Sequence, residues 1–166
     1  MLIAVISDTH LPRGARRLPT ECVERIAAAD LLLHAGDFST IETLRELEAI
    51  GPPLAAVHGN VDSADVRRLL PAERVVEAAG ARIAMVHDGG PAAGRLARLR
   101  RAYGERADAV VFGHSHLPLH ERDRDFQIFN PGSPTERRRA PGHTMGLARV
   151  EAGALRFELV PLERSR

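Results

Sequence analysis

Short apolar runs recur along the first two thirds of the chain, and each is followed by a polar or glycine-containing stretch. The runs lie at residues 2–6, 30–34, 54–57, 82–86 and 109–112. Short apolar runs without polar alternation are typical of strands that are covered on both faces. The pattern therefore predicts buried strands, most of them parallel, whose carboxyl ends lead into polar loops.

Helical patterns separate these runs. Apolar residues at helical spacing over residues 41–50 predict a helix that Ser39 or Thr40 caps. Three further helices are predicted, one with Thr20 as its N-cap, one over residues 65–70 and one over residues 92–103. Strands that alternate with helices are typical of an α/β arrangement.

After residue 116 the pattern changes to pairs of strands joined by turns. The predicted pairs are residues 119–121 with 126–130 and residues 144–150 with 155–160, and an earlier pair joins residues 75–78 to 82–86. We therefore expect an α/β (α+β) fold in which two packed mixed sheets are flanked by helices. We expect residues 1–166 to form a single domain.

Composition narrows the functional classes. The 166 residues carry a formal net charge of +1, so overall charge gives no case for a nucleic acid or an acidic partner. Every basic side chain is Arg, which excludes Schiff-base chemistry on Lys and a P-loop lysine. Cys22 is the single cysteine and stands between acidic residues that would raise its pKa, so we interpret it as a packed helix residue.

No stretch predicts export or membrane insertion. Met1 leads directly into a strand-like run, without the basic and apolar regions of a signal peptide. No apolar run approaches the length of about 20 residues that a membrane-spanning helix needs. We therefore expect a cytoplasmic protein that does not contact a membrane.

Potential metal ligands follow five of the predicted strands. They are Asp8 and His10, then Asp37, Asn60 and His87, and finally His114 and His116. Each has an ordinary alternative explanation: Asp8 could cap the next segment, and Gly59-Asn60 could form a simple turn. The carboxyl ends of neighbouring parallel strands meet at one edge of a sheet, where α/β proteins place ligand groups.

Together these side chains supply two carboxylates, one amide and four imidazoles. Seven such groups suffice for two metal ions, and the carboxylate of Asp37 can bridge two cations, which an imidazole cannot do. Mixed nitrogen and oxygen ligands suit Mn²⁺, Fe²⁺ and Zn²⁺ better than Ca²⁺. The sequence therefore predicts a site for two divalent metal ions.

The order of these residues resembles the calcineurin-like metallophosphoesterase superfamily. The family pattern is matched by Asp8-Thr9-His10, Gly36-Asp37, Gly59-Asn60, His87 and Gly113-His114-Ser115-His116. Gly59-Asn60-Val61-Asp62, Asn130-Pro131-Gly132-Ser133 and the short chain are similar to the small YfcE-type phosphodiesterase branch. The resemblance covers nearly the whole chain and implies a four-layer αββα sandwich.

The resemblance also implies ligand roles. It assigns Asp8, His10 and His116 to one metal and Asn60, His87 and His114 to the other, with Asp37 as the bridge and Asn60 also binding substrate. The implied reaction is hydrolysis of a phosphoester P–O bond by in-line attack of a hydroxide that bridges two metals. We expect Mn²⁺ as the metal, while Fe, Ni²⁺, Co²⁺ and Zn²⁺ suit the same ligands.

Two departures from the family pattern bear on the chemistry. Val61 stands where larger family members often carry a His that protonates the leaving group. The nearby Asp62 could be that acid, but it could also cap the following helix or orient a neighbour. Asp88 follows His87 and could orient its ring or repel anionic substrates. We interpret His34 as a packed or supporting residue, and His58, His120 and His143 as non-ligands.

Two other functions compete with a phosphodiesterase. The retromer scaffold subunit shares the implied fold, but it is a protein-binding module whose metal site is degraded. In this chain, by contrast, all seven positions hold residues that can bind a metal. A nuclease is the second alternative, since the basic run at residues 137–139 could contact a phosphate backbone. Assembly into a homo-oligomer is compatible with the family but leaves no signal in the sequence.

Overall fold

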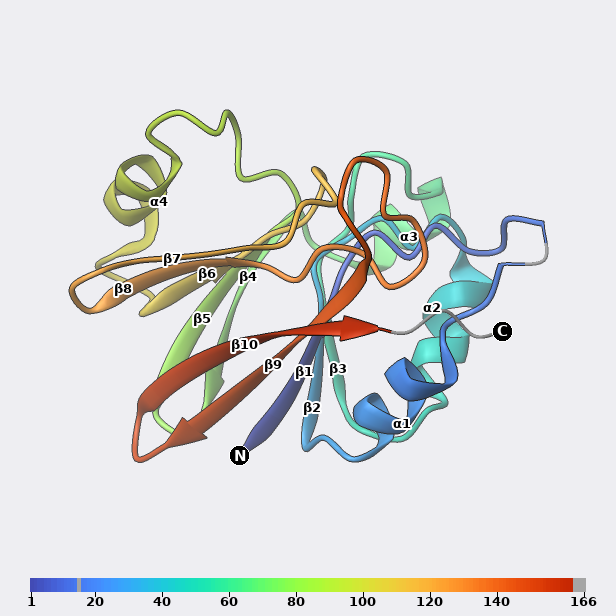
Figure 1. Cartoon of the computed structure of the whole chain (residues 1–166), viewed down its shortest axis with the longest axis horizontal. Coiled ribbons are helices and arrows are strands. Elements are labelled where there is room, and N and C mark those ends of the chain that lie inside the picture. The colour runs from blue at the N-terminus through green and yellow to red at the C-terminus, as the bar shows by residue number, and fades with distance from the viewer. Residues whose placement is uncertain (15, 163–166) are drawn as a thin grey trace.

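Two five-stranded sheets form the centre of the molecule (Figure 1). The computed structural model describes residues 1–14 and 16–162. The first sheet has the order β10-β9-β1-β2-β3, formed by β1 (Leu2–Ile6), β2 (Leu31–His34), β3 (Leu54–Ala56), β9 (His143–Glu151) and β10 (Ala154–Leu162). Strands β1, β2 and β3 are parallel, and the β9–β10 hairpin extends the sheet in antiparallel fashion.

The second sheet has the order β4-β5-β6-β8-β7. Its strands are β4 (Glu73–Ala78), β5 (Ala81–Val86), β6 (Ala109–Val111), β7 (Leu119–Asp123) and β8 (Phe126–Asn130). The three central strands β5, β6 and β8 are parallel, and the edge strands β4 and β7 are antiparallel to their neighbours. Both predicted strand pairs of this region are therefore present.

The position of β1, with both faces covered, explains why its sequence is apolar without interruption. Ile3 and Val5 point into the core between the two sheets, where they are fully buried. Ala4 and Ile6 point to the opposite face and are buried against helices. Successive side chains of a strand face opposite sides, so a strand covered on both sides needs apolar residues at every position.

Helices cover the outer faces of both sheets. The first sheet is covered by α1 (Thr20–Ala27), α2 (Ile41–Glu48) and α3 (Ala64–Leu69), and the second by α4 (Arg95–Tyr103) (Figure 1). Separate apolar cores lie between the sheets, under α1–α3 and under α4. The predicted four-layer αββα sandwich is confirmed. Across residues 1–14 and 16–162, every helix is too short or too polar to cross a bilayer.

Helix starts differ from the prediction at three places. Pro19 occupies the N-cap of α1 and Thr20 is already helical, so the predicted Thr20 cap is wrong. Ser63 caps α3 through a bond from Val66 N, so Asp62 is not the cap. Helix α4 begins at Arg95 because Gly94 has φ +66°, a left-handed conformation that a helix cannot include. Thr40 caps α2, as one of the two predicted candidates.

Candidate metal centre

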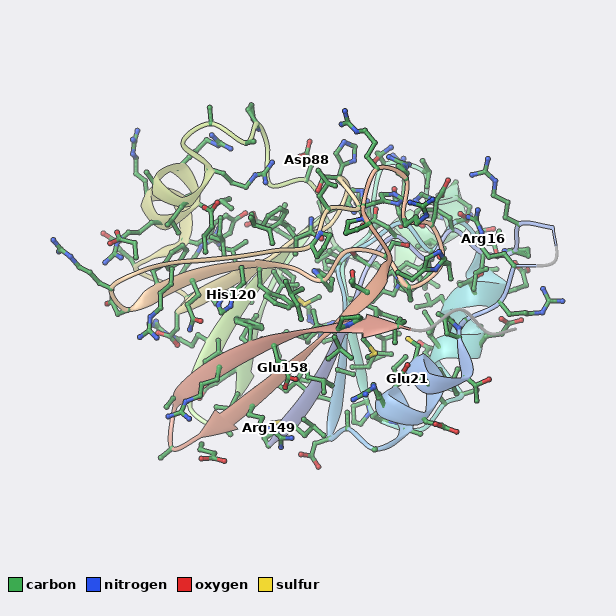
Figure 2. The ribbon with its side chains drawn as sticks, in the orientation of Figure 1. Arg16, Glu21, Asp88, His120, Arg149 and Glu158 are labelled. Atoms are coloured by element: carbon green, nitrogen blue, oxygen red, sulfur yellow. The ribbon has the colours of Figure 1, made fainter. Side chains whose placement is uncertain are left out.

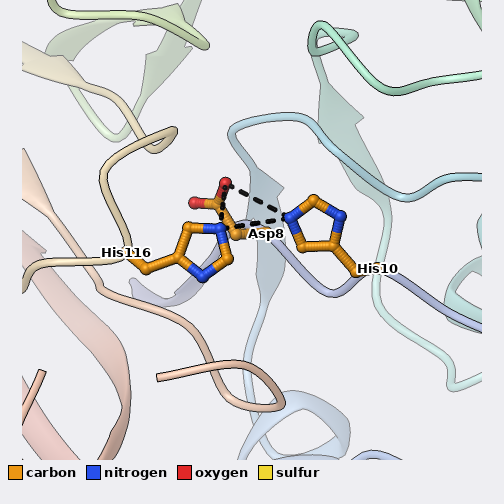
Figure 3. A group of neighbouring side chains, drawn as sticks. All are labelled: Asp8, His10 and His116. Atoms are coloured by element: carbon orange, nitrogen blue, oxygen red, sulfur yellow. Dashed lines mark hydrogen bonds and ion pairs between the residues drawn. The ribbon is translucent and has the colours of Figure 1, made fainter. Parts of the chain in front are cut away.

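The first ligand group consists of Asp8 and His10 after β1 and His116 after β6 (Figure 3). The Nε2 atoms of His10 and His116 lie 3.1 Å apart. Oδ1 of Asp8 lies 3.4 Å from Nε2 of His116 and 3.9 Å from Nε2 of His10. All three residues are buried, so one carboxylate oxygen and two imidazole nitrogens face one another away from bulk solvent.

The second group consists of Asp37 after β2, His87 after β5 and His114 after β6. Oδ2 of Asp37 lies 3.2 Å from Nε2 of His87. Asn60, in the loop after β3, places its Oδ1 3.0 Å from Nε2 of His87 and 2.9 Å from Nδ1 of His114. The amide oxygen of Asn60 therefore belongs to this group together with the three titratable residues.

Asp37 lies between the two groups. The same oxygen that faces His87, Oδ2, lies 3.7 Å from Nε2 of His10 in the first group. A carboxylate in this position can contact cations on both sides. The structure thus brings all seven sequence-predicted residues together at the carboxyl ends of the parallel strands, in two adjacent groups.

Most of these residues have an unusual backbone conformation. Asp8, His10, Asp37, His114 and His116 all have positive φ angles, between 46° and 65°. Left-handed backbone is uncommon for residues other than Gly and costs roughly 1–3 kcal/mol where the surroundings impose it. Five such residues in one site indicate that the fold holds these side chains in place before any ligand binds.

The rings of two histidines are oriented by backbone carbonyls. Nδ1 of His87 donates to the Ala35 carbonyl over 2.8 Å, and Nδ1 of His116 donates to the Glu136 carbonyl. In the neutral ring, the lone pair is then on Nε2, which points into the site. This second contact is typical of histidines that bind metals.

The converging atoms fit a pair of divalent cations. In a neutral His87 ring, Nε2 would carry a lone pair and yet lie beside the acceptor oxygens of Asp37 and Asn60. Acceptors that face one another repel unless a proton or a cation lies between them. Carboxylate, amide oxygen and imidazole are ligands of Mn²⁺, Fe²⁺ and Zn²⁺. The donor set therefore matches the metals that the sequence predicts.

The pKa values of three of these residues depend on burial and on neighbouring groups, and they determine which residues are in a metal-binding form. Burial raises the pKa of Asp8 to about 7. Burial also raises the pKa of Asp37, but the hydrogen bond and charge of His87 outweigh it and lower the value to about 2. Burial lowers the pKa of His116 to about 4. The centre therefore keeps the Asp37 carboxylate ionised and the His116 imidazole neutral, which are the forms that bind a metal.

Asp62 holds the loop that carries Asp37. Its Oδ2 accepts from the backbone N–H of Asp37 at 3.0 Å and of Gly59 at 2.7 Å, and its Oδ1 accepts from Ser39 N at 2.8 Å. The side chain is 5% exposed. Of the roles that the sequence left open for Asp62, the structure shows the orientation of a neighbour.

Two glycines allow the loops to approach the carboxylates. A Cβ at position 59 would lie 2.0 Å from Oδ1 of Asp37, and a Cβ at position 113 would lie 2.6 Å from Oδ2 of Asp8. Either atom would displace the carboxylate. The glycine at each of these motif positions is therefore required by the space around the ligand rather than by a turn.

The remaining histidines and Asp88 lie outside the ligand groups. His34 is buried, stacks on Phe38 at a centroid distance of 3.6 Å and contacts Thr9 Oγ1, so it is a packing residue as predicted. Asp88 (labelled in Figure 2) is exposed and accepts from Gly90 N. The carbonyl of Ala35 orients His87 instead. His58, His120 and His143 bond to Gly59 O, Gln127 Oε1 and Pro134 O.

The loop after β8 supports the site in a way that the sequence pattern did not reveal. Ser133 Oγ donates to the Asp8 carbonyl over 2.8 Å, and Thr135 Oγ1 donates to the Thr9 carbonyl over 2.6 Å. Asn130 Nδ2 donates to the Gly113 carbonyl over 2.8 Å. The residues of the Asn-Pro-Gly-Ser motif are thus hydrogen-bonded to both loops that supply the first ligand group.

Comparison with known proteins places the chain in a family. Residues 1–153 match the model of the calcineurin-like phosphoesterase superfamily domain. A probable metallophosphoesterase of Methanothermobacter thermautotrophicus is 34% identical over 161 residues, which cover 96% of this chain and 92% of the relative.

Solved structures share the fold at lower identity. Vps29 of Entamoeba histolytica, a single-mutant form, aligns with a TM-score of 0.77 at 21% identity, covering 98% of this chain and 100% of that chain. A novel archaeal phosphodiesterase aligns with a TM-score of 0.72 at 22% identity, covering 96% of this chain and 100% of that chain. From its ligand order and the matched family model, this chain belongs to the calcineurin-like phosphoesterase superfamily.

Proposed function

We propose that this metallophosphoesterase is a phosphodiesterase that works with two divalent metal ions. The observation that carries the proposal is the pair of adjacent ligand groups, Asp8–His10–His116 and Asp37–His87–His114, with Oδ2 of Asp37 facing both. Asn60 completes the second group through its Oδ1. The proposed substrate is a phosphodiester, and Mn²⁺ is the metal that we expect.

The ligand groups would hold the ions that supply the nucleophile and the charge stabilisation. When bound, two divalent ions would lower the pKa of a water and stabilise the oxygens of a transferring phosphoryl group. The residues of this chain hold the ions and fix their spacing. Asp37 serves both groups, and Asn60, a neutral ligand that is itself exposed, lies where a phosphoryl oxygen can reach its amide.

The loop after Asn60 determines which leaving groups react. Val61 is 45% exposed and has no proton to give. The carboxylate of Asp62 accepts three backbone N–H bonds, so it is not available to protonate a departing oxygen. We therefore expect substrates with good leaving groups to react fastest, because a poor leaving group needs a general acid.

The test is a comparison of two chromogenic substrates. The protein is stripped with a chelator, reloaded with Mn²⁺, Ni²⁺ or Zn²⁺ separately, and assayed with bis-p-nitrophenyl phosphate and p-nitrophenyl phosphate. We expect turnover that depends on metal and favours the diester. Preference for the monoester would instead indicate a phosphatase. Two bound equivalents without turnover of either substrate would favour the protein-binding scaffold.

Nucleic acid is a second candidate for the phosphodiester. Arg138 is exposed on the loop that follows Glu136. Burial has the largest effect on the pKa values of Asp8, His10 and His116, and the charge of Arg138 lowers all three. An exposed guanidinium whose charge acts on the first ligand group can bind a neighbouring phosphate. Hydrolysis of a single-stranded oligonucleotide that weakens steeply with salt would support a nuclease.

A further inference from the structure

Glu136 is fixed beside the first ligand group by its own loop. Its carbonyl accepts the Nδ1–H of His116, and its N–H donates to Ser133 Oγ over 2.9 Å. Ser133 in turn donates to the carbonyl of Asp8. The backbone of Glu136 is therefore tied to two of the three residues in that group.

The Glu136 side chain points toward the third. Its Oε2 lies 3.9 Å from Nε2 of His10, and the side chain is 19% exposed. Oε2 is buried and has no hydrogen-bond partner among the described residues. A buried acceptor without a partner costs roughly 1–3 kcal/mol, and more when it is charged. Among the described residues, Oε2 therefore lacks a hydrogen-bond donor.

Two arginines form ion pairs with the Glu136 carboxylate, but neither donates a hydrogen bond to Oε2. Arg13 Nη1 donates to Oε1 over 3.2 Å, and Arg16 Nη1 lies 3.4 Å from Oε2 without forming a hydrogen bond. Both arginines come from the loop after β1, where Figure 2 labels Arg16. Among the described residues, Oε2 is thus left with the ion-pair contacts to Arg16 and His10 and without a hydrogen bond.

We propose that Glu136 is an additional carboxylate beside the first metal site and that its negative charge strengthens the binding of a divalent cation there. The inference rests on the proposed function in one respect, that Asp8, His10 and His116 hold a metal. Oε2 of Glu136 lies 3.9 Å from Nε2 of His10, but Glu136 is not among the residues whose ligand atoms all lie within 4.8 Å of one another. Its carboxylate therefore acts on the cation through its charge and not as a fourth ligand.

The added carboxylate also makes the two sites unequal. The first group then has Asp8 and shared Asp37 with Glu136 beside them, whereas Asp37 alone supplies a carboxylate to the second group among the described residues. More negative charge around a cation raises its affinity, most strongly where burial excludes water. We therefore expect the first site to fill before the second.

The test is a calorimetric titration of the chelator-stripped protein with Mn²⁺. Glu136→Gln keeps the shape and removes the charge. We expect it to weaken one of two Mn²⁺ sites by about 10- to 100-fold, the range seen when supporting groups of metal sites are removed. The matched control is Glu77→Gln, an exposed carboxylate on β4, which should leave both affinities unchanged. Circular dichroism confirms folding, and Glu136→Asp, which retains the charge, should recover part of the affinity.

A second variant separates the effect of the Glu136 charge on the metal from the effect of its ion pair on the position of the loop. Arg16→Gln breaks the ion pair but keeps the carboxylate, so we expect Mn²⁺ to bind as tightly as in the wild type or more tightly. Weakening by Arg16→Gln equal to that by Glu136→Gln would overturn the proposal, as would unchanged binding in Glu136→Gln. In either case a wild-type protein with two Mn²⁺ sites leaves the proposed function intact, whereas a wild type that binds no metal contradicts that function itself.

Discussion

The carboxylate of Asp62 accepts the backbone N–H of Asp37 over 3.0 Å, so one acidic residue holds the main chain of another. The bond fixes the loop in which Asp37 has φ +63°. The Asp37 carboxylate also accepts the N–H of Val61 over 3.0 Å, which closes a reciprocal link between the two loops. The position of the carboxylate shared by both ligand groups therefore depends on Asp62.

Replacing Asp62 by Ala should destabilise the protein and weaken metal binding. The variant leaves three N–H groups without their charged acceptor, and a hydrogen bond to a charged group contributes roughly 1.5–3 kcal/mol. We expect the free energy of unfolding to fall by about 3 kcal/mol in urea denaturation, because water can replace part of the loss.

The control for this variant is Asp65→Ala, which removes an exposed ion pair with Arg68 on α3. Its free energy of unfolding should change by less than about 0.5 kcal/mol. If Asp62→Ala is as stable as the wild type and loses activity only on substrates with poor leaving groups, Asp62 is the general acid and our assignment is wrong.

A methyl group at position 59 should abolish metal binding at both groups. The Cβ of Gly59→Ala would lie 2.0 Å from Oδ1 and 2.6 Å from the backbone N of Asp37, so the shared carboxylate must move. Equilibrium dialysis with Mn²⁺ should then find neither site filled at concentrations that saturate the wild type. Gly142→Ala is the matched control, since nothing lies within 4 Å of its Cβ. Two retained sites in Gly59→Ala would argue against a shared Asp37.

Metal binding should release protons at mildly acidic pH. Burial raises the pKa of Asp8 to about 7, and although burial lowers that of His87, Asp37 and Asp8 raise it overall. A raised pKa means that each group holds its proton to a higher pH than usual, in Asp8 to about 7, so a metal ion must displace that proton. Affinity for Mn²⁺ should therefore rise with pH through 7.

Calorimetry in buffers of different ionisation enthalpy measures this release directly. The apparent enthalpy should depend on the buffer at about pH 6, and this dependence should weaken as the pH rises past 7, where Asp8 loses its proton. Buffer-independent enthalpies at the lower pH would show that Asp8 and His87 are deprotonated without metal.

Cys22 should be unreactive in the folded protein. Burial raises the pKa of its thiol to about 12, with a smaller contribution from Glu21, and the side chain is fully buried between α1 and the first sheet. The thiolate is the reactive form, so a thiol reagent at neutral pH should label the chain only after denaturant is added. Rapid labelling of the native protein would mean that α1 opens readily.

The ligand positions were predictable because strand ends are visible in the sequence. Apolar runs at β1, β2 and β6 end in Asp8, Asp37 and His114 within a few residues, and parallel strands bring such ends together. The unbroken apolar character of β1 likewise predicted cover on both faces, which the inter-sheet core and α1–α3 provide.

Other features depend on distances that a sequence does not show. Glu136 follows a proline-rich turn rather than a strand, and only the fold places its carboxylate beside His10. Asp62 lies two residues from Asn60, but two of its three N–H donors, Asp37 and Ser39, come from the loop after β2, which is distant in sequence. The cap of α1 was misassigned because Thr20 is a preferred cap residue, whereas Pro19 occupies that position.

The most direct test of the central claim counts the bound metal ions and asks whether they are magnetically coupled. Electron paramagnetic resonance of the stripped wild type titrated with Mn²⁺ should show two ions per chain and the spectrum of a magnetically coupled pair, because both groups share Asp37. Asp37→Asn should lose the coupled signal and diester hydrolysis together. A single ion, or two uncoupled ions in a fully active wild type, would contradict a shared two-metal centre.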